Sequence, residues 1–140
     1  MSDVTRAREL LSGKVTCALV KGEKAYVSEK SGVAPMLSFI AEGIDLSGFS
    51  AADKIVGKAS AMLFVKAGVR AVYAEVLSVA GREFLENAGV EVSFGALTER
   101  IINRAGTGQC PMEKCVEYIS DAEEGYTALK NKIISMRKQA

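Results

Sequence analysis

Apolar residues recur along the chain with two different periods, which indicate helices and strands respectively. Helical spacing and helix-boundary residues predict helices over residues 3–12, 33–40, 50–66, 79–87 and 121–138. Apolar runs or alternation predict strands over residues 15–20, 25–28, 69–77 and 90–94. The first two strands are joined by a tight turn and predict a β-hairpin. Strands that alternate with helices are typical of an α/β domain with a partly parallel sheet covered on both faces.

The helix predicted to begin at Ser50 carries charged residues among its apolar ones. Ser50 followed by Asp53 resembles a capping box with Asp in place of Glu. Lys54 and Lys58 stand one turn apart and would share a helix face. Gly57 in a helix interior is unfavourable by about 1 kcal/mol relative to alanine, and its missing side chain permits close approach by a ligand. Both lysines are therefore candidate ligand-binding residues, although a salt bridge or a snorkelling side chain also explains Lys58.

The run from residue 101 to 114, Ile-Ile-Asn-Arg-Ala-Gly-Thr-Gly-Gln-Cys-Pro-Met-Glu-Lys, combines a glycine-rich turn with a helix start. Cys110 precedes a proline, and Glu113 stands three residues after it, where its carboxylate can reach back to the cap. A thiol at a helix N-terminus favours the thiolate, whereas a buried, inert cysteine is the alternative. The turn would present backbone amides to an anion, unless it is an ordinary connection. Its candidate ligand-binding residues are Asn103, Arg104, Thr107 and Gly108.

Composition narrows the class of function. A chain of 140 residues predicts a single domain over 1–140. With 18 basic and 17 acidic residues the formal charge is +1, which argues against a nucleic-acid binder. No apolar run is long enough to span a membrane, and the N-terminal residues lack the apolar stretch of a secretion signal. Three cysteines fit free thiols in a reducing compartment, so we expect a cytoplasmic protein.

Metal chemistry is not expected from this sequence. The chain has no histidine, the most common metal ligand and the side chain that titrates nearest neutral pH. Cys110 and Cys115 are separated by four residues, which does not match the Cys-x-x-Cys spacing of zinc sites. We therefore predict no metal and no cofactor.

The C-terminal helix carries one apolar stripe. Its members follow a 4-3-4-3 spacing and are Ala122, Tyr126, Leu129, Ile133 and Met136. Acidic residues near its start and basic residues near its end match the helix dipole. The stripe predicts either a helix docked on the sheet or a seam that pairs two copies as a homodimer.

Four segments together resemble a family of small prokaryotic proteins of unknown function. They are residues 16–20, 52–59, 72–74 and, above all, 101–114. The likeness covers roughly residues 10–119. That family is grouped with the cytidine-deaminase-like fold, so the resemblance implies a three-layer α-β-α sandwich with a mixed sheet. The predicted order of hairpin, helix, strand, helix and strand agrees with this fold.

The resemblance carries the fold rather than the deaminase reaction. Zinc deaminases place His or Cys with Glu at one helix start and Pro-Cys-x-x-Cys at the next. The matching residues here, 52–54 (Ala-Asp-Lys) and 77–81 (Leu-Ser-Val-Ala-Gly), contain neither His nor Cys. We therefore expect a zinc-independent domain that binds a small anionic, nucleotide-like ligand. In this interpretation Cys110 is a nucleophile or redox thiol, and Asp53 or Glu113 moves protons. A non-catalytic interaction or dimerisation module is the alternative.

Overall fold

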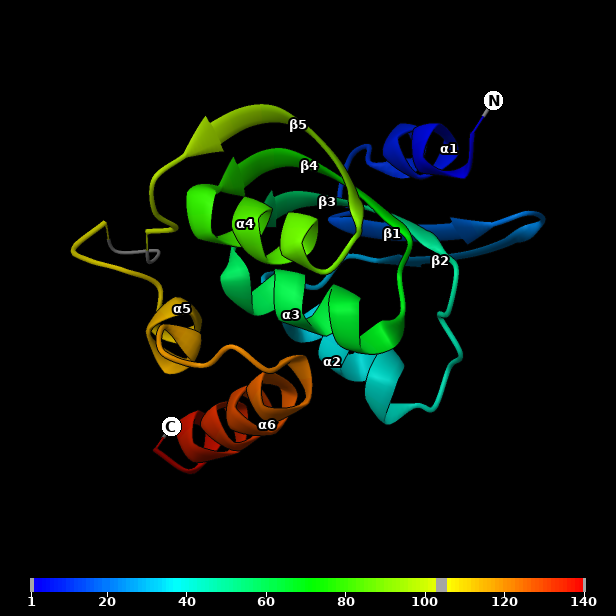
Figure 1. The fold of residues 1–140 in the computed structure, drawn as a ribbon. Helices are drawn as coiled ribbons and strands as arrows, with labels where there is room; N and C mark the ends of the chain where they lie inside the picture. The colour runs from blue at the N-terminus through cyan, green and yellow to red at the C-terminus, as the bar shows by residue number, and fades with distance from the viewer. Residues whose placement is uncertain (1, 103–105, 140) are drawn as a thin grey trace.

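The computed structural model describes residues 2–102 and 106–139, and its central feature is a five-stranded mixed sheet (Figure 1). The strands are β1 Cys17–Lys21, β2 Lys24–Ser28, β3 Ser50–Val56, β4 Ala71–Ser78 and β5 Glu91–Thr98. Their order across the sheet is β2-β1-β3-β4-β5. β1 is antiparallel to both β2 and β3, whereas β3, β4 and β5 are parallel. The hairpin and the partly parallel sheet expected from the sequence are both confirmed.

Helices cover both faces of the sheet. They are α1 Asp3–Leu10, α2 Ala34–Ala41, α3 Lys58–Ala67, α4 Val79–Asn87, α5 Pro111–Val116 and α6 Ala122–Gln139. α1 lies on one face, where a small apolar cluster joins it to the sheet. α2, α3 and α4 lie on the other face, and α5 and α6 pack against α3 from outside (Figure 1). The α/β sandwich expected from the sequence is therefore confirmed, with α5 and α6 added outside one helix layer.

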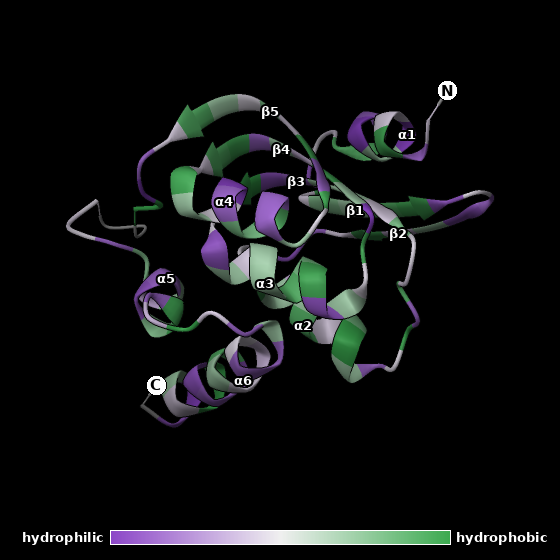
Figure 2. Cartoon of the chain, viewed as in Figure 1, coloured by the Kyte–Doolittle hydropathy of each residue, from purple (hydrophilic) through white to green (hydrophobic). Residues whose placement is uncertain are grey.

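The larger core lies between the sheet and α3. Six consecutive residues of α3, from Ala59 to Phe64, are buried, because the sheet covers one side of this helix and α6 covers another. In Figure 2 most of α3 is white to green, whereas α6 alternates between purple and green along its length. A helix that is apolar on nearly every side belongs in the interior, and a two-sided helix belongs at the surface.

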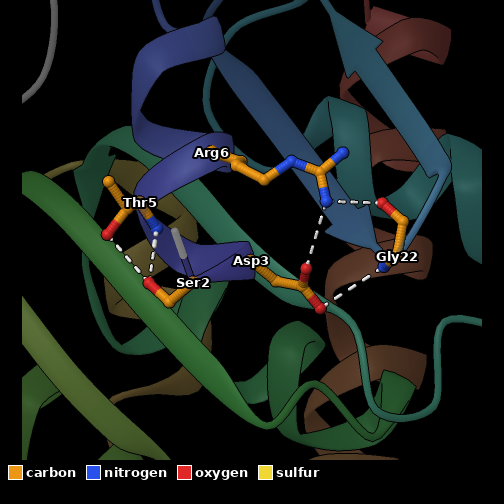
Figure 3. A network of polar contacts seen from close by, with 5 residues as sticks. All are labelled: Ser2, Asp3, Thr5, Arg6 and Gly22. Atoms are coloured by element: carbon orange, nitrogen blue, oxygen red, sulfur yellow. Dashed lines mark hydrogen bonds and ion pairs between the residues drawn. The ribbon is translucent and has the colours of Figure 1, made fainter.

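A polar network fixes α1 to the turn of the hairpin (Figure 3). The Ser2 hydroxyl caps the helix by accepting a hydrogen bond from the Thr5 amide at 3.2 Å. Arg6 Nη1 donates to the Gly22 carbonyl at 2.6 Å and forms an ion pair with Asp3 at 3.4 Å. The Gly22 amide donates to Asp3 Oδ2 at 3.4 Å. Residues far apart in sequence thus hold α1 on its face of the sheet.

The helix predicted over residues 50–66 is wrong in its first half. Residues 50–56 form the central strand β3, which is hydrogen-bonded to β1 on one side and to β4 on the other. Alanine has the highest helix propensity, but propensity is a weak preference, and strand pairing on both sides overrides it here. Ala51 and Ala52 are fully buried in the two separate apolar clusters that cover opposite faces of the sheet.

This correction changes the geometry expected for the charged residues. Ser50 and Asp53 do not form a capping box, and Lys54 and Lys58 do not share a helix face, because three of these four lie on a strand. Gly57 is the N-cap of α3, with extended backbone, and not an interior residue. The helix start expected at residues 52–54 therefore lies at Lys58, and the residues around it are again neither His nor Cys.

The apolar stripe of α6 is docked, on α3 and α5 and not directly on the sheet. Leu129 is fully buried, and Tyr126 and Ile133 are partly buried against the main core. Met136, at the end of the stripe, is 41% exposed. Most of the stripe is therefore used inside the chain, as expected for a docked helix.

Candidate functional site

A cleft of about 760 Å³ opens where β3, β4 and β5 end. It runs along α3 and α4, from Lys58 and Ala80 in their first turns to Val65 and Ala88. The end beside Lys58 lies at the carboxyl ends of parallel strands, which is where ligands bind in open α/β sheets generally. α3 and α4 line one part of it, and the segments after β5 line the rest. Among the candidate site residues that the structure describes, Lys58 and Glu113 line this cleft.

Glu113 connects α5 to the N-terminus of α3. Its carboxylate accepts hydrogen bonds from the Lys58 amide (Oε1, 2.9 Å) and from the Ala59 amide (Oε2, 2.8 Å). The prediction that Glu113 reaches back to its own helix cap is therefore wrong. Gly57 makes the contact possible, because a Cβ on this residue would lie 2.4 Å from Glu113 Oε1. Two charge-assisted hydrogen bonds satisfy amides that a glycine cap leaves without a side-chain acceptor.

Lys58 makes a second contact with α5 through its side chain. Its Nζ donates a hydrogen bond to the Glu117 carbonyl at 3.1 Å. Glu117 is the C-cap of α5, so the ammonium lies at the negative end of that helix dipole. Both ends of Lys58, backbone and side chain, are thereby bound to one short helix.

The first turn of α4 packs closely against the start of α3. A Cβ on Gly81 would lie 2.9 Å from the Gly57 carbonyl carbon. The Gly81 amide donates to the Ser78 hydroxyl at 3.0 Å, which caps α4. The amides of Lys58, Ala59 and Gly81 thus have acceptors within the protein. These three amides are therefore not available to an anionic ligand in this state.

The charge of the cleft is mixed, with an acidic excess. Lys58 and Arg100 are its basic residues. Its acidic residues are Glu83, Glu99, Glu113, Glu117 and Asp121. A ligand with only negative charge would face repulsion from these carboxylates, so the lining favours a molecule that also carries hydrogen-bond donors.

Asp53 lies outside the cleft, in the middle of the sheet. It is paired in register with Cys17 of β1 and Ala74 of β4, and it is 6% exposed. Burial raises the pKa of its carboxyl to about 8, although the nearby backbone amides of Lys54 and Ile55 oppose the shift. Burial, together with the charge of Asp53, also raises the pKa of the Cys17 thiol. The carboxyl is thus kept protonated at neutral pH by its apolar surroundings.

Lys54 also lies away from the cleft. Its Nζ donates to the Gly13 carbonyl at 3.2 Å, in the loop that follows α1. Lys54 and Lys58 were expected together at one pocket. Because β3 ends between them, Lys54 is directed to the α1 side of the sheet, and Lys58 begins α3 on the other side.

Cys110 is the N-cap of α5, as the sequence predicted, and its side chain is half-buried against the main core. It does not line the cleft, and neither do Thr107 and Gly108. Asn103 and Arg104 lie outside the described residues. Within residues 2–102 and 106–139, no group of three or more His, Cys, Asp or Glu side chains is placed to hold a metal ion.

Most of the acidic residues that line the cleft were not among the site residues predicted from the sequence. Glu117 stands four residues after Glu113, a spacing that places side chains together on a helix, so this pair had a local signal. Arg100 and Gln109 flank the glycine-rich turn and could have been included with it. Glu83 had no local signal, because its place in the cleft depends on how α4 packs beside α3.

A family model described as "Domain of unknown function (DUF1893)" matches residues 6–133, nearly the whole chain. The chain belongs to the DUF1893 family. This DUF1893 domain is similar in structure to a DUF1893 family protein from Thermotoga maritima, with a TM-score of 0.83 and 24% sequence identity. The match covers 94% of this chain and 91% of that one, and it shows the shared fold. No significant match exists among curated proteins.

A second solved structure resembles this DUF1893 domain more distantly. It is a diaminohydroxyphosphoribosylaminopyrimidine deaminase/5-amino-6-(5-phosphoribosylamino)uracil reductase, also from Thermotoga maritima. The TM-score is 0.48 at 18% identity, and the match covers 66% of this chain and 35% of that one. Within the described residues of the DUF1893 domain, no helix is both long and apolar enough to cross a membrane.

Proposed function

We propose that this DUF1893 domain binds a small nucleotide-like ligand in the cleft beside α3 and α4. The observation that carries the proposal is the position of Lys58, the first residue of α3, in a cleft of about 760 Å³ whose Lys58 end lies at the carboxyl ends of three parallel strands. A volume of this order suits a small organic molecule. The geometry favours Lys58 over Lys54, whose amine is held on the other side of the sheet.

The mixed charge of the lining supports this ligand class. A phosphate or carboxylate group would be held by the ammonium of Lys58 and the guanidinium of Arg100. Amino groups on a heterocycle would donate to the carboxylates of Glu83 or Glu99. A nucleotide carries both kinds of group, whereas inorganic phosphate carries one. The proposal uses no metal ion and assigns no reaction.

The test is isothermal titration with AMP, CMP, GMP, UMP and inorganic phosphate. We expect at least one nucleotide to bind more tightly than phosphate, and Lys58→Ala to weaken that binding by about 10- to 100-fold, because a hydrogen bond to a charged group contributes about 1.5–3 kcal/mol. Circular dichroism would establish that the variant is folded.

Lys54→Ala is the matched control, because it removes the same ammonium from the α1 side of the sheet. Its nucleotide affinity should equal that of the wild type. The proposal is contradicted if no nucleotide binds, or if the two alanine variants lose affinity equally.

A further inference from the structure

One stretch of chain, residues 109–121, supplies a large part of the cleft lining and is called the strap below. It contains α5 and the loop that leads to α6. The strap residues that line the cleft are Gln109, Glu113, Glu117, Ser120 and Asp121. The shape of the cleft therefore depends on whether the strap stays packed against α3.

Glu113 is the main polar contact between the strap and α3. Its side chain is only 7% exposed, and each carboxylate oxygen binds one amide of the first turn of α3. The contact joins residues more than 50 positions apart in the chain. A buried carboxylate with two charge-assisted bonds is held firmly, and it would be costly to leave it buried without them.

Lys58 supplies the second contact, and it uses the same amine that the proposed function assigns to the ligand. The ammonium is bound to the Glu117 carbonyl of the strap. The ammonium has three N–H donors and uses one of them here, so the contact fixes the position of the ammonium and leaves two donors. An anion elsewhere in the cleft must draw the ammonium away from this carbonyl, so closing of the strap and binding of such an anion compete for the position of one side chain.

Apart from these polar contacts, apolar packing holds the strap against the core and against α6. α5 has six residues, too few to be stable as a helix without tertiary contacts. Its apolar contribution to the core comes from Met112 and Val116, with Cys110 and Cys115 partly buried beside them. Loss of the Glu113 contact would therefore weaken the docking of the whole segment.

We infer that the strap is a latch on the cleft. The hydrogen bonds of Glu113 hold the strap on α3, and the Glu117 carbonyl of the strap holds the ammonium of Lys58 away from a ligand. In the closed state Lys58 is bound to Glu117. In the open state the strap leaves α3, and the ammonium becomes available to an anion. Ligand affinity then scales with the fraction of molecules in the open state. This role of Lys58 rests on the proposed function, whereas the opening of the strap does not.

Hydrogen–deuterium exchange on the ligand-free protein tests the latch. Glu113→Gln keeps the size of the side chain but removes its charge and one of the two acceptor oxygens. We expect amides in residues 57–60 and 111–116 to exchange about tenfold faster or more, with β4 unchanged. Unchanged exchange in these two segments, or faster exchange through the whole domain, overturns the inference. Glu29→Gln, on an exposed loop residue, is the matched control and should change neither segment.

If Glu113→Gln does not fold, the same hydrogen-exchange measurement is made on Lys58→Ala. This variant removes the contact with Glu117 and leaves the buried carboxylate in place, so exchange should rise in residues 114–121 and stay unchanged in 57–60. Gly57→Ala breaks the Glu113 contact from the α3 side, because its methyl group would occupy the position of the carboxylate. It should raise exchange in both segments. A variant that folds and shows the wild-type pattern contradicts the latch.

A titration with AMP separates the latch from the proposed function. If the strap restrains Lys58, Glu113→Gln should bind AMP several-fold more tightly than the wild type, because the closed state no longer competes. Equal or weaker binding by that variant overturns the latch while the proposed function stands. If AMP and the other nucleotides do not bind the wild type, the proposed function fails, and hydrogen exchange alone decides the latch.

Discussion

Asp53 is a carboxylic acid that is buried in the sheet, although acidic side chains usually lie at the surface. A carboxyl group lies in the central strand of the sheet, with neighbours on both sides. Burial disfavours its ionised form, which raises its pKa to about 8 from the ordinary 3.8. The sequence suggested a proton-transfer role for Asp53, but it does not line the cleft. Its chemistry instead makes the stability of the fold depend on pH.

The sign of that pH dependence follows from proton binding in the two states. Above pH 3.8 the unfolded chain releases the Asp53 proton, whereas the folded protein keeps it until about pH 8. The unfolded state therefore binds fewer protons in this window, and the free energy of unfolding falls as pH rises, by up to about 1.4 kcal/mol per pH unit. Asp53→Asn should lack this decline, so its stability relative to the wild type should grow from pH 4 to pH 8.

Urea denaturation at five pH values between 4 and 9 measures the effect of Asp53→Asn. Asp45→Asn is a suitable control, because Asp45 is exposed and its pKa is lowered by hydrogen bonds from Ser47. That variant should show no growing advantage over the wild type in the same window. Parallel curves for the wild type and Asp53→Asn would show that Asp53 is ionised in the folded protein near neutral pH.

At the scale of elements, α6 shows how a surface helix becomes part of the core. Gly125 approaches α3 so closely that a Cβ there would lie 2.4 Å from Met62 Sδ. One turn further on, Leu129 is fully buried. Lys66 of α3 forms an ion pair with Glu123 at 2.6 Å near the start of α6. Packing and charge together fix α6 on α3, so most of its apolar stripe is covered within one chain.

Truncation of the stripe should therefore affect stability and leave the molecular mass unchanged. Leu129→Ala is expected to lower the free energy of unfolding by about 2–5 kcal/mol, because it leaves a cavity in a packed core. Met136→Ala, on the same stripe but 41% exposed, should cost less than about 0.5 kcal/mol. Urea denaturation measures both, and light scattering measures the mass. Equal effects of the two variants, or a loss of dimer in Leu129→Ala, would favour a seam between copies.

At the scale of the whole molecule, the cleft is assembled from parts that are distant in the chain. α3 and α4 come from the middle of the sequence, and the strap follows β5. The family match, over residues 6–133, includes all of these parts. The cleft thus belongs to the domain as a unit, and any change that loosens the strap alters the cleft without altering the sheet.

The fold as a whole should also hold without metal. No metal-binding cluster is present among residues 2–102 and 106–139, so EDTA should leave the thermal midpoint of unfolding unchanged, and added zinc should not raise it. Structural metal stabilises only the folded state, and its removal lowers the midpoint. Differential scanning fluorimetry with both additives makes the measurement. A lower midpoint in EDTA would reveal a metal site that the side-chain arrangement does not suggest.

The sequence by itself determined those helices and strands whose apolar spacing and end signals lie within the element. The hairpin, α2, α4 and α6 were predicted close to their observed bounds, because apolar spacing and glycine stops are read within one element. The helix start at Cys110 was also predicted, because the proline that follows it acts locally. Of the predicted site residues, Lys58 and Glu113 line the cleft.

Only the tertiary structure decided the rest. Residues 50–56 have an alanine-rich, ambiguous pattern, and two neighbouring strands make them a strand. Glu113 was expected to cap its own helix, yet it binds the amides of α3, because Gly57 leaves room for its carboxylate there. Such contacts depend on which segments meet in three dimensions. A buried hydrogen bond or a strand pair stabilises the fold even when its partners are far apart in the chain, so the local sequence does not reveal it.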